Sequence, residues 1–100
     1  MVIPKNYSRN IIDISDKDLY STIKTVKYLA PIIMNSVDAE GFCIEQNNET
    51  AAGQIVMHTH FHIIPRFKDD NLTHWPSKPT SQQELNQIKE KIEENLNNKI

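Results

Sequence analysis

Apolar residues recur at spacings of three and four through the first third of the chain, and this period predicts an amphipathic helix. Ser15 precedes Asp16 and Asp18, the pattern of a helix N-cap followed by an acidic first turn. Pro31 falls inside the pattern and should kink or split the helix; Gly41 should end it. The stripe that we expect to face the core consists of Leu19, Ile23, Val26, Ala30, Ile33 and Val37.

Three segments have the composition or the alternation of β-strands. Residues 1–3 and 42–46 are expected to form short strands, and residues 54–64 a longer one that Pro65 should stop. The polar stretch 66–80 should form a surface loop or a crossing arm.

A last helix is predicted from a capping box, in which Ser81 is followed three residues later by Glu84. Its apolar stripe is narrow and consists of Leu85, Ile88, Ile92 and Leu96. We therefore divide the chain into a domain at residues 1–80 and a C-terminal helix at 81–100. That helix could pack on the domain or on a partner subunit.

Length and charge exclude several classes of protein. The chain has 100 residues, enough for one domain, and 11 Lys and Arg against 13 Asp and Glu give a net charge of −2. A near-neutral balance argues against nucleic-acid binding, which needs a strongly basic face. No apolar run reaches the roughly 18–20 residues of a membrane span, and the N-terminus does not resemble a signal peptide. Cys43 is the single cysteine, so no internal disulfide can form. We expect a cytoplasmic protein with no membrane partner.

The strongest chemical signal is the alternation of His58, His60 and His62 within the longest expected strand. Residues two apart on a strand share one face, so the three imidazoles should line up over a cleft or an interface. The opposite face should belong to the core and consists of Met57, Thr59, Phe61 and Ile63.

Three interpretations of this row are open. Because imidazole titrates near neutrality, one histidine could attack phosphorus while another donates a proton to the leaving group. Alternate histidines on a strand could instead share one zinc ion with a ligand from elsewhere. The third interpretation is a row of partly exposed side chains on a polar sheet face.

Residues 52–66, Ala-Gly-Gln-Ile-Val-Met-His-Thr-His-Phe-His-Ile-Ile-Pro-Arg, resemble the signature of the histidine triad (HIT) family. Residues 2–5, Val-Ile-Pro-Lys, are similar to the end of an earlier strand in that family, and Asn47 falls where the family has an asparagine that contacts the nucleotide. The resemblance covers about residues 1–67 and is closest to the Hint-like branch.

The resemblance implies an α+β, HIT-like fold, in which a long helix packs on an antiparallel sheet and two subunits form a symmetric homodimer. It also implies cleavage at the α-phosphorus of a nucleoside monophosphate derivative. By position, His60 would be the nucleophile that forms a nucleotidyl-histidine intermediate. His62 would contact the phosphate and help the leaving group, and His58 would orient the row. The residues expected to bind the nucleotide are Asn47, Gly53, Gln54 and Ile55.

The implied substrates are purine nucleotide conjugates, namely adenosine phosphoramidates, acyl-adenylates or dinucleoside polyphosphates. No metal and no cofactor are required for the attack by His60 in this scheme. Gly53 agrees with an anion site, since a residue without Cβ lets the backbone approach a phosphate closely.

Three departures from the family pattern bear on activity. Ile55 stands where the family usually has Ser or Thr, so a hydroxyl contact to phosphate is lost. Glu49 replaces a common Gly and brings a negative charge to the turn. The chain also begins where family members are already some 40–50 residues long (estimated from the family pattern), so we expect a truncated HIT domain. The alternative to a weakened hydrolase is a catalytically silent nucleotide-binding or scaffold protein of the same fold.

Overall fold

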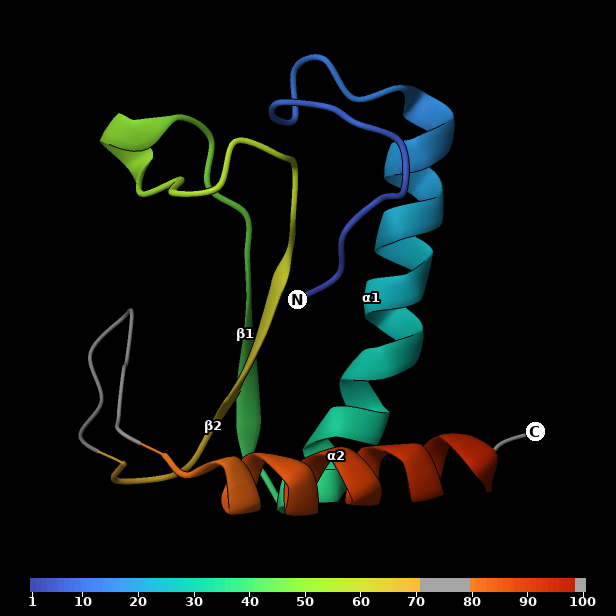
Figure 1. The fold of residues 1–100 in the computed structure, drawn as a ribbon, viewed down its shortest axis with the longest axis vertical. Coiled ribbons are helices and arrows are strands. Elements are labelled where there is room, and N and C mark those ends of the chain that lie inside the picture. Colours follow the sequence, from blue (N-terminus) through green and yellow to red (C-terminus); the bar gives the residue numbers. More distant parts are fainter. Residues whose placement is uncertain (71–79, 99–100) are drawn as a thin grey trace.

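The computed structural model describes residues 1–70 and 80–98, which form an α+β fold with a long helix beside a two-stranded antiparallel sheet (Figure 1). Its elements in chain order are α1 (Asp16–Val37), β1 (Gly41–Glu45), the 3₁₀ turn η1 (Thr50–Ala52), β2 (His62–Arg66) and α2 (Gln82–Asn97). Most of the expected polar arm at 66–80, including His74 and Trp75, lies outside the described residues.

Helix α1 begins where the sequence predicts, because the hydroxyl of Ser15 accepts a hydrogen bond from the Asp18 amide at 3.1 Å. Pro31 does not split it. Proline removes the bond to the carbonyl four residues earlier; Pro31 and Lys27 are both exposed, so water can reach that carbonyl. The prediction that Gly41 ends the helix was wrong. Asp38, at a φ of 54°, caps it and donates its amide to the Met34 carbonyl, since Asp also tolerates the left-handed conformation.

The predicted strand at 54–64 was wrong at both ends. Strand β2 starts at His62 and continues through Pro65, which lies opposite Phe42 of β1. Residues 54–60 are irregular because their hydrogen bonds go elsewhere: the Thr59 amide donates to the Ser8 carbonyl at 2.8 Å. A single bridge joins Phe61 to Val2, and this is all that the structure retains of the expected strand at 1–3.

The core lies between α1 and the segment around Phe61. Its buried centre consists of Val2, Val26 and Phe61, against which Ile11, Leu19, Leu29 and Ile63 pack. In Figure 1 the N-terminal segment runs between the strands and α1. The segment therefore supports the residues that lead into β2.

Helix α2 lies across one end of α1 (Figure 1). The Ser81 hydroxyl caps it by accepting from the Glu84 amide at 3.1 Å. Its Asn95 donates to the hydroxyl of Ser36 on α1 at 2.9 Å. Ile32 lies one turn before Ser36 on the same face and is only 1% exposed. The predicted stripe missed it and included Ile23, which is 44% exposed, because the stripe assumed that only one side of α1 is covered.

Among residues 1–70 and 80–98, no helix has the length and apolar character needed to span a membrane.

Candidate active site

The imidazoles of His60 and His62 meet edge to face, with ring centroids 4.9 Å apart. His60 precedes β2 and is 9% exposed, and His62 is the half-buried first residue of the strand. Between them Phe61 points into the core and bridges to Val2 in both directions, at 2.8 and 2.9 Å. The alternation that the sequence suggested therefore holds across these three residues, although only the last of them belongs to a regular strand.

One hydrogen bond fixes the tautomer of His60. Its Nδ1 lies 2.7 Å from the carbonyl oxygen of His58. A carbonyl oxygen can only accept, so Nδ1 carries the proton. In the neutral ring the lone pair is then on Nε2. The backbone thus presents His60 in the form that a nucleophile or a base requires.

His62 is held towards its neutral form. Burial lowers its pKa, and the neighbouring charges of His60 and of the Met1 amino group lower it further, while Glu45 opposes them. Glu45 lies opposite His62 in the pairing of β1 with β2. An anion bound beside His62 would favour its protonated form.

His58 faces the N-terminal segment. Its Nε2 lies 3.0 Å from the Pro4 carbonyl and therefore donates to it. The ring of Tyr7 meets that of His58 edge to face, with centroids 5.5 Å apart. Between His58 and His60, Thr59 is fully buried; its hydroxyl donates to the Ser8 carbonyl at 3.2 Å and accepts from the Ser8 hydroxyl at 2.7 Å. Residues 4–8 thus hold this part of the row.

Asn47 and Gly53 lie together at the turn formed by η1. The Asn47 side-chain amide donates to the Ala52 carbonyl at 2.8 Å. Gly53 has a φ of 95°, and a Cβ there would stand 3.7 Å from the Asn47 Nδ2. Its positive φ favours glycine. The two residues therefore lie side by side at this turn, and their binding of the nucleotide stays a prediction.

Gln54 and Ile55, which the resemblance gives as nucleotide-binding residues, lie in opposite environments, one buried and one exposed. The Gln54 side chain is 1% exposed. Its Oε1 accepts from the Glu49 amide at 2.7 Å, and its Nε2 donates to the carbonyls of Arg9 and Val56 at 2.7 and 3.0 Å. Gln54 therefore links three backbone segments. Ile55 is 84% exposed, and its side chain has no hydrogen-bonding group.

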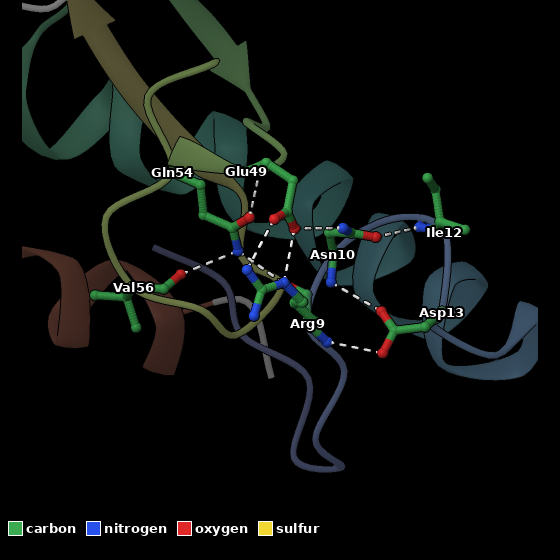
Figure 2. A network of polar contacts seen from close by, with 7 residues as sticks. All are labelled: Arg9, Asn10, Ile12, Asp13, Glu49, Gln54 and Val56. Atoms are coloured by element: carbon green, nitrogen blue, oxygen red, sulfur yellow. Dashed lines mark hydrogen bonds and ion pairs between the residues drawn. The ribbon is translucent and has the colours of Figure 1, made fainter. Parts of the chain in front are cut away.

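Sequence reasoning missed a polar network that ties residues 9–13 to this turn (Figure 2). Arg9 forms a two-pronged ion pair with Glu49, with Nε–Oε2 and Nη2–Oε1 distances of 2.8 Å. The Asn10 side-chain amide also donates to Glu49 at 2.8 Å. Asp13 accepts from the amides of Arg9 and Asn10 at 3.0 and 2.9 Å, and these bonds lower its pKa. Arg9 and Glu49 are 40 residues apart, and no local pattern connects them.

The described residues include no group of three or more His, Cys, Asp or Glu side chains placed to hold a metal ion. The expectation that catalysis requires no cofactor stays a prediction.

Comparison with known proteins identifies relatives of this chain. It is 46% identical over 68 residues to an uncharacterized HIT-like protein of Mesomycoplasma hyorhinis, a match that covers 68% of this chain and 61% of the relative. It is 34% identical over 104 residues to the adenosine 5′-monophosphoramidase HNT1 of Candida albicans, covering 96% of this chain and 67% of that enzyme. The chain thus spans about two thirds of the length of these two relatives.

Solved structures give the same result for the fold. A Hit-like protein of Bartonella henselae matches with a TM-score of 0.80 at 35% identity, over 93% of this chain and 67% of that one. A histidine triad nucleotide-binding protein of Sulfolobus tokodaii matches with a TM-score of 0.83 at 28% identity, over 96% and 67%. The protein-family model of the HIT domain matches residues 1–69 of this chain. This chain belongs to the HIT domain family.

Proposed function

We propose that the chain is a nucleotide hydrolase or transferase that acts at the α-phosphorus of a purine nucleotide conjugate through His60. The observation that carries this proposal is the 2.7 Å bond from Nδ1 of His60 to the His58 carbonyl. It places the lone pair on Nε2, where an attack on phosphorus would begin. A nucleophile with a fixed tautomer needs no proton transfer before it attacks.

The reaction would proceed in two steps. Nε2 of His60 forms a bond to the α-phosphorus while the bond to the leaving group breaks, and the leaving group takes a proton from His62 or from water. Water then attacks the same phosphorus and gives a proton to neutral His62 or to solvent, the P–N bond to His60 breaks, and the nucleoside monophosphate leaves with the added oxygen. His62 can be protonated for the first step because the substrate phosphate offsets the burial that lowers its pKa.

The names of two relatives support an adenylyl substrate. The Candida albicans relative is an adenosine 5′-monophosphoramidase. An Arabidopsis thaliana relative, 30% identical over 90 residues, is an adenylylsulfatase. The conjugates that these names indicate share an adenosine 5′-phosphate and differ in the leaving group. We therefore propose adenosine phosphoramidate as the first substrate to test.

The test is release of AMP from adenosine 5′-phosphoramidate by the wild-type chain and by His60→Gln. The glutamine side chain fills similar space but cannot form a phosphorus–nitrogen intermediate, so turnover should fall by about a thousandfold or more. Intact-mass spectrometry of acid-quenched wild type should also show an adenylyl adduct that the variant lacks. Equal rates from two folded proteins would rule out catalysis by His60.

One observation favours a second candidate, a catalytically silent nucleotide binder. Ile55 is 84% exposed and stands where the family usually places a hydroxyl. One lost hydrogen bond to a charged group costs about 1.5–3 kcal/mol, which can reduce turnover by tenfold or more. Calorimetry with AMP, run beside the turnover assay, separates the candidates: a silent binder binds AMP and releases none.

We also propose that two copies associate through the exposed apolar face shared by α1 and β1. A groove of about 470 Å³ on this face is lined by Ile23, Val26, Lys27, Ala30, Pro31, Met34, Phe42 and Ile44. Strand β1 is an edge of the described sheet, and an exposed edge can pair with its own copy about a twofold axis. Light scattering should report a dimer for the wild type and a monomer for Ile44→Lys. A wild-type monomer would exclude this interface.

A further inference from the structure

We propose that Glu49, held by Arg9 and Asn10, is a positioning residue that fixes the turn at residues 47–54 for binding the nucleotide phosphate. This inference rests on the proposed function, because it assigns a role in nucleotide binding to a polar network that surrounds the turn. The network itself is seen in Figure 2, where the Glu49 carboxylate points towards Arg9 and Asn10.

Each polar group of Glu49 has a partner. Its two carboxylate oxygens accept from Arg9 and Asn10 at 2.8 Å. Its amide donates to the side-chain oxygen of Gln54 at 2.7 Å. Its carbonyl accepts from the amides of Ala52 and Gln54, each at 3.0 Å. Glu49 therefore closes the turn through its backbone and connects the turn to Arg9 and Asn10 through its side chain.

The backbone of Glu49 has an unfavourable conformation for its residue type. Its φ of 72° and ψ of 162° lie in a region that glycine occupies almost alone. A glycine would adopt it without strain, but it would have no side chain to reach Arg9. Such a conformation persists only where the surrounding contacts impose it. The hydrogen bonds of its amide, its carbonyl and its carboxylate together hold Glu49 in this conformation.

The network links the turn to the histidines through residues 8–10. Gln54 donates to the Arg9 carbonyl at 2.7 Å, so Arg9 is held through both its main chain and its side chain. Ser8, the preceding residue, binds Thr59, which lies between His58 and His60. A shift of Arg9 would thus be transmitted both to the turn and to the nucleophile.

The ionised carboxylate of Glu49 and its pairing with Arg9 support the same positioning role. The hydrogen bonds from Arg9 and Asn10 lower the pKa of Glu49 to about 2, so the carboxylate stays ionised and paired throughout the neutral range. Arg9 offsets the negative charge that Glu49 would otherwise present to a phosphate. Without this pair, an anionic substrate would meet an unbalanced carboxylate at the turn.

The decisive variant is Glu49→Gly, because it removes the anchor and also relieves the backbone strain. Its thermal midpoint should stay close to that of the wild type. Its Kd for AMP should rise by about fivefold or more, and its kcat/KM for adenosine 5′-phosphoramidate should fall by about tenfold, as expected when a substrate-binding group is misplaced. Arg9→Lys keeps the positive charge but loses the two-pronged contact. Its Kd for AMP should therefore lie between those of the wild type and Glu49→Gly.

A matched control is Glu93→Gln, which breaks the exposed ion pair to Lys89 on α2 and should leave both constants unchanged. All measurements are made at a temperature at which every variant is fully folded. If the wild type binds AMP and Glu49→Gly binds it equally well, the positioning role is wrong while the proposed function stands. If the wild type neither binds AMP nor releases it, the proposed function fails and the positioning role fails with it.

Discussion

The two halves of the segment from Gln54 to Arg66 are held in different ways. After Phe61, residues 62–66 pair regularly with β1. Before Phe61, residues 54–60 form no ladder and are held by contacts with residues 2–10, several of them from side chains. His60 lies in the first half and His62 in the second. The candidate site therefore lies where the irregular segment meets the regular strand.

The two halves therefore position the two histidines in different ways. A strand ladder spaces side chains at fixed intervals, and it sets where His62 lies. The irregular half turns one backbone carbonyl onto Nδ1 of His60, which a regular strand could not do because its carbonyls point to neighbouring strands. We infer that the position of the His60 imidazole depends on residues 2–10, whereas β1 and β2 mainly contribute stability.

Among the substitutions that compare the two halves, Thr59→Val, in the irregular half, has the largest expected effect. Thr59 is fully buried and its hydroxyl bonds to Ser8 twice. Valine leaves the buried Ser8 hydroxyl without its acceptor, so the free energy of unfolding should fall by about 1–3 kcal/mol, and turnover should fall with it. Urea unfolding and the AMP-release assay measure the two effects.

Two controls make this result specific. Thr59→Ser keeps the hydroxyl, so its turnover should stay near that of the wild type. Ile64→Val changes the regular half and should lower the free energy of unfolding by at most about 0.5–1.5 kcal/mol without altering turnover by the folded protein. If Ile64→Val reduced turnover as much as Thr59→Val, catalysis would depend on the regular half as strongly as on the irregular half, and the inference would be wrong.

A smaller effect is expected from His62, at the boundary. Its pKa is lowered in the folded chain by burial, by His60 and by the Met1 amino group, against the opposing charge of Glu45. Below about pH 6.5 the unfolded chain therefore binds more protons at this residue than the folded chain does. The free energy of unfolding should decrease as the pH falls from about 6.5 through the folded-state pKa, and should be independent of His62 above that range.

Urea titrations between pH 5 and 8 check this sign against His62→Asn, which cannot titrate. The slope below about pH 6.5 should be shallower in the variant than in the wild type. Glu49 does not interfere, because its pKa of about 2 keeps it ionised throughout this range. Identical slopes would show that His62 is not held towards its neutral form.

Local signals in the sequence predicted local features well. The caps at Ser15 and Ser81 are contacts across three residues, and both were predicted. The alternation of His60, Phe61 and His62 was sufficient to place two imidazoles together and the phenyl ring in the core. The HIT family and the α+β class were also predicted and are confirmed by the family match and the solved structures.

Contacts between distant residues could not be predicted. The strand at 54–64 has the alternation of a strand, but the partner of its first half is the irregular segment around Ser8, 51 residues earlier. Helix α2 meets α1 through the bond from Asn95 to Ser36, 59 residues apart, and Glu49 is paired with Arg9. The hydrogen bond from the Gln54 side chain to the Arg9 carbonyl likewise spans 45 residues. In each case the deciding partner is remote in sequence.

The smallest effect is expected from Pro65→Ala, in the regular half. A proline was expected to stop the strand, yet Pro65 lies inside β2 opposite Phe42. Because proline has no amide hydrogen, this pair cannot exchange the two hydrogen bonds of a bonded antiparallel pair. Alanine would therefore add an N–H that β1 does not need, and the free energy of unfolding should change by no more than about 0.5 kcal/mol. Urea unfolding checks this, with Ile64→Val as the reference. A change larger than that of the reference would mean that Pro65 does more than pair with Phe42, and that the regular half depends on its rigid φ.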